Sequence, residues 1–185
     1  MVPHVDVGAL FLSIRRLFVG LLLVGCVLVA IGGVIVAQAG RDEATGSDTA
    51  ILMLDGTPSA QAARTDRVVR LFLGSQISRV ILTGAVTAPT RDILIARGVL
   101  KDKIAEANAP QQIAQIEQVQ HILDQSRTPD AMLIAEPIES LRLLKIARDR
   151  GLVLHSSPAT SDTSIDFGDL VEEVGRYLVY CFEGR

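Results

Sequence analysis

The sequence holds few of the residues that form disulfides and metal sites. Its 185 residues include two cysteines and three histidines. Cys26 lies within an apolar run and Cys181 lies near the C-terminus, so we expect no disulfide between them and interpret both as apolar packing residues. His4, His121 and His155 lie far apart, with no liganding neighbours at helical spacing. The sequence therefore predicts no metal site, and no pattern in it indicates a cofactor.

Basic charge is also scarce. The chain has 18 basic and 21 acidic residues, for a net charge of −3. Removing the two basic residues and the one acidic residue of positions 1–40 leaves 16 basic against 20 acidic. Binding to nucleic acid needs basic side chains that neutralise phosphates, and here they form no basic stripe. We expect no nucleic-acid partner.

One long apolar run is present. Residues 17–39 carry no charge and follow directly on Arg15 and Arg16. About 20 apolar residues, at a helical rise of about 1.5 Å each, cross a bilayer core of about 30 Å. We therefore predict a transmembrane helix at 17–39, between an N-terminal segment at 1–16 and a polar linker at 40–49. The remaining residues, 50–185, have the usual size of one domain.

The charges beside this run predict its orientation. Arg15 and Arg16 precede it, whereas Arg41 follows it and is itself followed by Asp42 and Glu43. Basic residues close to a span tend to stay on the cytoplasmic side. We predict that the N-terminus is cytoplasmic and that the domain at 50–185 is extracytoplasmic.

Two processing signals offer alternatives to an uncleaved anchor. Residues 23–26, LVGC, have the small-residue pattern of a lipoprotein cleavage site, which would leave Cys26 lipidated. Residues 15–19, RRLFV, resemble a twin-arginine export signal. The apolar run continues past Cys26, and it is long for a signal that is removed. We favour the uncleaved anchor.

The rest of the chain alternates short apolar runs with segments of helical periodicity. We predict strands at 50–54, 79–83, 130–135 and 152–155, and helices at 59–73, 90–97, 110–125, 137–150 and 167–182. Continuous apolar strands separated by helices are typical of a mostly parallel sheet covered on both faces. The predicted fold is a Rossmann-like three-layer α/β domain. Such sheets bind ligands beyond the carboxyl ends of their strands, here in the loops at 55–59, 84–90, 135–140 and 155–161.

The order of these segments resembles a bacterial family. The matching phrases are AILMLDGTPS, RTDRVVRLFLGS, VILTGA, ARGVLKDKIAEAN and DAMLIAEPIESLRLLKIARDRGLVL, which together span roughly residues 49–185. They resemble the YdcF/SanA/ElyC-like envelope family, a domain family of unknown function. The resemblance implies a location in the bacterial plasma membrane and a pocket for a small anionic ligand. The implied pocket residues are Asp55, Gly56, Arg64, Thr83, Gly84, Glu106 and Arg142.

The departures from the family pattern affect its polar residues. After the glutamate that matches Glu106, the family has Ser, Asn-Thr and Glu-Asn, and its later helix carries a His before the arginine that matches Arg142. This chain has instead Ala109, Gln111, Gln112, Ala114, Gln115 and Glu139. Alanine and glutamine supply no general acid or base, so the change argues against catalysis.

The remaining candidates also have structural interpretations. Arg142 shares its helix with Arg148 and Arg150 and is open to interpretation as a solvated or salt-bridged residue. Arg64 has Asp55 and Asp66 as alternative ion-pair partners. An Asp before a Gly, as at Asp55, is a common turn former.

These features lead to two hypotheses. The first is a membrane-anchored, non-catalytic accessory or scaffolding subunit of a larger bacterial membrane complex, with integral-membrane partners. Small residues in the span favour close helix packing; they are Gly20, Gly25, Gly32, Gly33 and Ala37. The alternative is an envelope-biogenesis protein that binds a nucleotide, S-adenosylmethionine or polyprenyl phosphate.

Overall fold

The computed structural model describes residues 7–39, 41–43, 47–128, 130–159 and 166–184, with side chains from residue 15 onward. Several predicted features lie partly outside these ranges: residues 1–6 of the N-terminal segment with His4, residues 40 and 44–46 of the linker, and residues 160–161 of the last loop. The elements in chain order are α1 (Val7–Ala39), β1 (Thr49–Met53), α2 (Pro58–Leu73), β2 (Arg79–Gly84), α3 (Ala88–Ala96), η1 (Lys101–Lys103), β3 (Ile104–Asn108), α4 (Gln112–Ser126), β4 (Asp130–Ile134), η2 (Pro137–Glu139), α5 (Ser140–Asp149), β5 (Val153–Ser156) and α6 (Phe167–Glu183).

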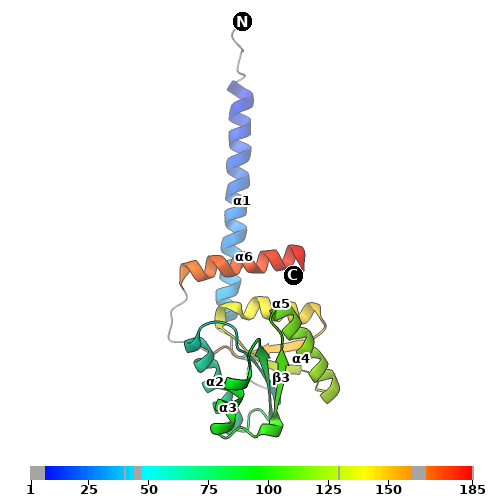
Figure 1. The fold of residues 1–185 in the computed structure, drawn as a ribbon. Coiled ribbons are helices and arrows are strands. Elements are labelled where there is room, and N and C mark those ends of the chain that lie inside the picture. Colours follow the sequence, from blue (N-terminus) through cyan, green and yellow to red (C-terminus); the bar gives the residue numbers. More distant parts are fainter. Residues whose placement is uncertain (1–6, 40, 44–46, 129, 160–165, 185) are drawn as a thin grey trace.

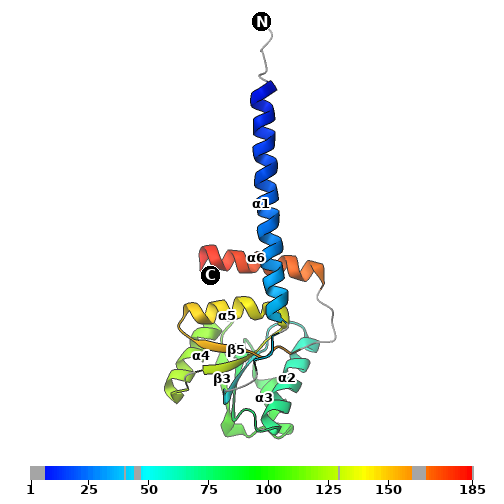
Figure 2. The same ribbon diagram turned by 180° about the vertical axis from the view of Figure 1, so that it is seen from behind.

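The five strands form one parallel sheet with helices on both faces (Figures 1 and 2). Their order is β3-β2-β1-β4-β5, and all four neighbouring pairs run parallel. Leu52 and Leu82 pack on one face with residues of α2 and α3. Ile51 and Ile81 pack on the opposite face with residues of α4 and α5. This confirms the predicted Rossmann-like α/β fold.

The strand β3 was not predicted as a strand. Its sequence, IAEAN, lacks a continuous apolar run, and Ala107 is its one fully buried residue. The strand lies at the edge of the sheet, where one side of its ladder is unpaired and less apolar burial is needed. The sequence predicted four strands and missed this fifth one, β3.

The other elements differ from prediction mainly at their ends. Helix α2 begins at Pro58 because Thr57 accepts a hydrogen bond from the backbone N–H of Ala60 and caps it. The predicted helix at 137–150 is divided into the 3-10 turn η2 and the α-helix α5. Helix α4 begins at Gln112, two residues later than predicted.

The chain reverses its direction of travel across the sheet once. It runs outward from β1 through β2 to β3, and α4 then carries it back to β4 on the other side of β1. The carboxyl ends of β1 and β4 therefore flank the topological switch point. In open parallel sheets this is where ligands bind.

Helix α1 projects far from the domain (Figure 1). Within the part of the chain that the structure describes, Arg15–Ala39 is the one helical stretch long and apolar enough to cross a membrane, with a mean hydropathy of 2.9. All side chains from residue 15 to residue 30 are exposed, which separates this helix from the core helix of a water-soluble protein. The helix itself extends the predicted span toward the N-terminus, beginning at Val7.

The last turns of α1 belong to the folded domain. Ile35 and Ala39 are buried, and this end of the helix contacts η2, α5 and α6. Helix α6 lies across α1 in both views (Figures 1 and 2). The contact is close at Gly32, where an added Cβ would lie 3.7 Å from Cδ2 of Leu170.

Both cysteines are exposed on the protein. Cys26 is part of the exposed stretch of α1, and Cys181 lies near the C-terminal end of α6. Neither cysteine packs inside the domain. Each lies on an apolar helix surface that the protein itself leaves uncovered.

Candidate functional site

The switch point brings together three of the predicted site residues, Asp55, Gly56 and Arg64. Asp55 and Gly56 follow β1, and Arg64 reaches them from α2. Gly56 has a φ of +95°, and a Cβ there would lie 3.2 Å from Nη2 of Arg64 and 3.4 Å from Oε1 of Glu136. Both the backbone conformation and the close approach of the arginine therefore require glycine at this position.

Arg64 is fully buried, with 0% of its surface exposed. Its Nε donates to the carbonyl oxygen of Ala60 at 3.1 Å, and its Nη2 donates to the carbonyl oxygen of Asp55. Burial lowers the pKa of Arg64, although the carboxylates of Glu136, Glu139 and Asp55 oppose this shift. The guanidinium thus ties α2 to the turn after β1 through backbone oxygens.

The ion pairs weighed for Arg64 in the sequence do not form. Asp66 pairs instead with Arg97. Asp55 meets Arg64 through its backbone carbonyl, and its side chain approaches Gln115, with 3.5 Å between Oδ1 and Nε2.

Gln115 is a member of the site that the sequence did not identify. It stands where the resembled family has an asparagine, so it is one of the departures from the family pattern described above. Its side chain is fully buried, and Nε2 donates to the carbonyl oxygen of Ala109 at 3.0 Å. The available signal was its position in the first turn of α4, the helix that connects β3 to β4 across the switch point.

Three buried polar atoms at the switch point have no hydrogen-bond partner among the described residues. They are Oδ2 of Asp55, Nη1 of Arg64 and Oε1 of Gln115. A buried polar atom without a partner has lost its hydrogen bonds to water and gained none in return. This desolvation destabilises the folded state by about 1–3 kcal/mol for each such atom. The unpartnered atoms are one donor, on Arg64, and two acceptors, on Asp55 and Gln115.

Thr83 and Gly84 have structural roles at the end of β2. The Thr83 hydroxyl is buried and donates to the carbonyl oxygen of Leu52 at 3.3 Å. A Cβ on Gly84 would lie 3.0 Å from Cβ of Leu54, so the glycine allows the two strand ends to approach. Neither residue makes a hydrogen bond to Arg64 or Asp55 among the contacts described.

Glu106 belongs to a separate cluster at the edge of the sheet. It lies on β3, two strands away from β1. Thr87 donates to its carboxylate, and Arg91 Nη1 lies 2.9 Å from Oε1. The hydrogen bond from Thr87, with help from Arg91, lowers the pKa of Glu106. The structure does not bring Glu106 to the switch point.

Arg142 is paired inside the protein. Its Nε lies 2.6 Å from Oε1 of Glu173, and its Nη2 lies 3.2 Å from Oε2 of the same residue. Glu139 lies 3.6 Å away, and Gln112 accepts a further hydrogen bond. This guanidinium is neutralised by two carboxylates and connects α5 to α6. Of the two structural interpretations given above for Arg142, the salt-bridged one describes these contacts.

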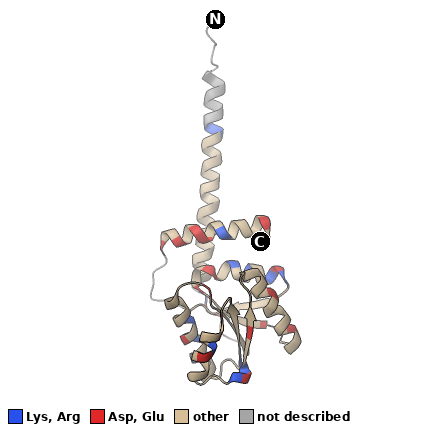
Figure 3. Cartoon of the chain, viewed as in Figure 1, with Lys and Arg blue, Asp and Glu red and all other residues tan. Residues whose placement is uncertain are grey.

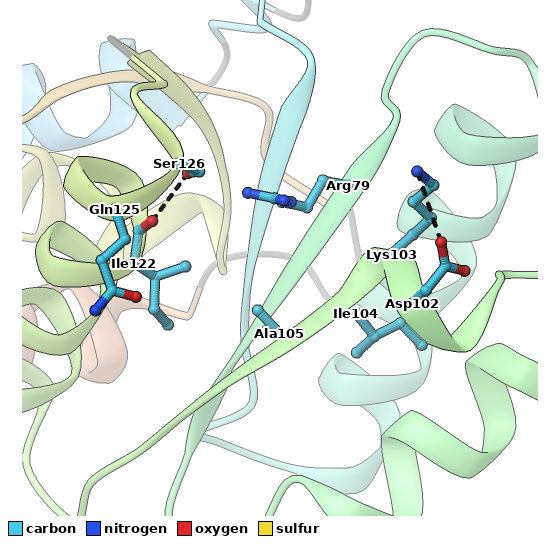
Figure 4. Close-up of a pocket in the computed structure, with 8 residues that line it drawn as sticks. All are labelled: Arg79, Asp102, Lys103, Ile104, Ala105, Ile122, Gln125 and Ser126. Atoms are coloured by element: carbon cyan, nitrogen blue, oxygen red, sulfur yellow. Dashed lines mark hydrogen bonds and ion pairs between the residues drawn. The ribbon is translucent and has the colours of Figure 1, made fainter.

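Two cavities lie away from the switch-point residues. One of about 690 Å³ lies between α4, α5 and α6, and its lining includes Ile113, Ile146 and Arg142. The other, of about 290 Å³, lies at the amino ends of β2 and β3, where Arg79 and the Lys103–Asp102 pair border it (Figure 4). Neither is lined by Asp55, Arg64 or Gln115.

The described residues contain no group of three or more His, Cys, Asp or Glu side chains that could hold a metal ion. His121 is exposed and lies 2.8 Å from Nε2 of Gln125. His155 lies 3.3 Å from a carboxylate oxygen of Asp130. Both histidines have partners on the surface of the domain, apart from the switch point.

Comparisons of the chain with family models, with curated proteins and with solved structures found no match.

The Arg142–Glu173 pair yields a prediction for stability. Glu173→Gln removes a carboxylate from a buried ion pair, and such a loss destabilises by about 3 kcal/mol because it leaves a buried charge poorly compensated. The measurement is urea unfolding of the detergent-solubilised full chain, followed by circular dichroism. Glu172→Gln is the matched control, since Glu172 makes an exposed pair with Arg176 worth about 0.5 kcal/mol. Equal losses in the two variants would contradict the structural role of Glu173.

Glu139 yields a prediction for pH dependence. Burial raises the pKa of Glu139, more strongly than Arg142 lowers it, so the folded state holds this proton more tightly than the unfolded state. Its contribution to stability is therefore lost as the pH rises above about 4.3 toward the raised pKa. Glu139→Gln removes this titration. We expect the free energy of unfolding of the variant, relative to the wild type, to increase with pH across that window in urea titrations. A difference that is flat or decreases with pH would show the prediction to be wrong.

Proposed function

We propose that this protein is a single-pass membrane-anchored, non-catalytic accessory or scaffolding subunit of a larger bacterial membrane complex. The observation that carries the proposal is helix α1, whose outer part is apolar and exposed and whose inner end is built into the domain. Respiratory, photosynthetic and cell-wall complexes are all candidates. The location in the plasma membrane follows from the resemblance to the envelope family.

The junction between α1 and the domain supports a permanent anchor. Removal of the helix at the end of the apolar run would take away the buried Ile35 and expose the surfaces of η2, α5 and α6 that α1 contacts. Burial of an isoleucine side chain stabilises by about 1.5–3 kcal/mol. A segment that is cut off after export has no need for such packing, so this observation favours the uncleaved anchor over a removed signal.

The state of the polar residues supports a non-catalytic role. Arg142 is neutralised by Glu173 and Glu139, and Arg64 has no exposed surface. General acid or base catalysis needs a titratable group within reach of a substrate. Arg64 ties α2 to the turn after β1, and Arg142 connects α5 to α6, so both guanidiniums have structural roles.

The small residues of α1 divide into two sets. Gly32 is covered by Leu170 of α6 and serves the fold itself. A Cβ at Gly20, Gly25 or Gly33 would meet nothing within 4 Å. Gly20 and Gly25, on the part of α1 that projects beyond α6, leave shallow places where a second membrane helix can approach closely, which supports an integral-membrane partner.

A second candidate function rests on the unpaired buried atoms of Asp55, Arg64 and Gln115. A nucleotide, S-adenosylmethionine or polyprenyl phosphate bound at the switch point would supply their missing hydrogen bonds. Such a ligand would raise the melting temperature of the full chain, by an amount that grows with the logarithm of its concentration above Kd. The absence of any shift with these three compounds would favour the scaffolding role.

Purification from the native membrane tests the scaffolding role. In mild detergent we expect a stoichiometric integral-membrane partner to accompany the protein. Gly25→Ile should reduce the co-purified partner while leaving the domain intact, because the added side chain meets only open space in the monomer. Leu22→Ile, on the same exposed stretch, should retain the partner. Recovery of the wild type as a lone monomer would contradict the proposal.

The orientation is tested separately. The flanking charges favour a cytoplasmic N-terminus and an extracytoplasmic domain. In a chain with Cys26→Ser and Cys181→Ser, a thiol introduced by Gln76→Cys, an exposed position of the domain, should react with a membrane-impermeant reagent in intact cells. Ser13→Cys should react only after the cells are permeabilised. The reverse pattern would invert the topology.

A further inference from the structure

We propose that helix α6 is a second membrane contact, lying in the interface of the bilayer with Val171 and Phe182 among the lipids. The proposal rests on the anchoring role of α1 proposed above. It adds that the domain is held against the membrane surface along a whole helix.

Helix α6 has three distinct faces. Glu173, Val174 and Tyr180 are buried against the rest of the protein. Asp169, Glu172 and Arg176 are exposed and form a polar face. The third face is apolar and exposed, with Phe182 at 85% and Phe167 at 78% exposure, joined by Val171 and Val179. A helix that only covered the domain would need a buried apolar face and an exposed polar face, but no exposed apolar face.

The apolar face points away from the domain. At about 100° per residue, Val171 lies about 160° around the helix from Glu173, and Phe182 lies about 180° from it. Glu173 points inward, where it pairs with Arg142 of α5. The face opposite Glu173 therefore looks away from α5 and the sheet.

The same face looks along α1 toward its exposed apolar part. Helix α6 lies across α1, with the domain on one side and the exposed length of α1 on the other (Figures 1 and 2). The two helices touch where Gly32 meets Leu170. A bilayer that contains the exposed part of α1 would therefore meet α6 side-on at the level of Gly32. An interfacial helix buries its apolar face about 5–10 Å into the headgroup and acyl boundary, and α6 is placed to do so.

The charge on α6 selects the kind of lipid surface. The helix carries four acidic residues and one basic residue, and red predominates along it in Figure 3. Anionic headgroups attract Lys and Arg and repel carboxylates. Contact with lipid therefore depends on the apolar side chains, and the matching surface is one of zwitterionic headgroups.

Depth-dependent quenching on the full chain tests this inference. The protein, with Cys26→Ser and Cys181→Ser, is reconstituted into phosphatidylcholine vesicles and labelled with an environment-sensitive fluorophore at one added cysteine. Val171→Cys and Phe182→Cys sample the apolar face, and Glu172→Cys samples the polar face of the same helix. We expect nitroxide-labelled lipid to quench the first two more strongly than the third, and aqueous iodide to show the opposite order.

Three outcomes would overturn the inference. Equal access of iodide to all three sites would show that α6 stands clear of the membrane. Protection of Val171→Cys and Phe182→Cys from iodide without quenching by nitroxide lipid would show that protein covers the face. Lipid quenching that appears only after anionic phosphatidylglycerol is added would show that apolar burial does not drive the contact.

A label at Leu23→Cys separates this inference from the anchor on which it rests. Leu23 lies in the exposed stretch of α1 and samples the span directly. Lipid quenching at Leu23→Cys together with iodide quenching at Phe182→Cys would remove the role of α6 and leave the anchor standing. Iodide quenching at both positions would remove the anchor as well.

Discussion

The buried pair between Arg142 and Glu173 determines how the outer parts of this protein are arranged. A buried charge is tolerated only with a partner and hydrogen bonds, so Glu173 must face α5. That requirement fixes the rotation of α6 about its own axis and leaves its apolar side chains outward. It also brings Leu170 against Gly32, which sets where α6 crosses α1. The ion pair thus links the sheet, through α5, to both helices that the domain leaves partly uncovered.

Most of the fold was predictable because its central strands are buried on both faces and read as continuous apolar runs. In this way residues 50–54 and 130–135 predicted β1 and β4. The helical periodicity between the apolar runs predicted the helices that connect the strands. Strand β3 has no continuous apolar run of this kind. An edge strand is paired on one side only, so its alternation of Ala with Glu106 and Asn108 was compatible with a loop.

The candidate site was predictable only where its residues are close in sequence. Asp55 and Gly56 lie in the loop after β1 that the switch-point rule indicates. Arg64, eleven residues after β1 ends at Met53, was implied only by the family resemblance. Gln115 and Glu173 reach the site region by the packing of distant helices, which no local pattern records. Glu106 shows the converse case. It matched the resembled pattern, yet its strand lies at the edge, beyond β2.

The crossing of α1 and α6 at Gly32 also bears on membrane thickness. With α6 at one interface, the uncharged helix available to the bilayer runs from Leu17 to the residue before Gly32, about 15 residues or about 22 Å of rise. This is less than the typical hydrocarbon core of about 30 Å. Arg15 and Arg16 would then have to extend their side chains outward to reach the far headgroups. Such hydrophobic mismatch favours thin or locally compressed bilayer, so the proposed placement of α6 would give the protein a preference for thinner regions of a membrane.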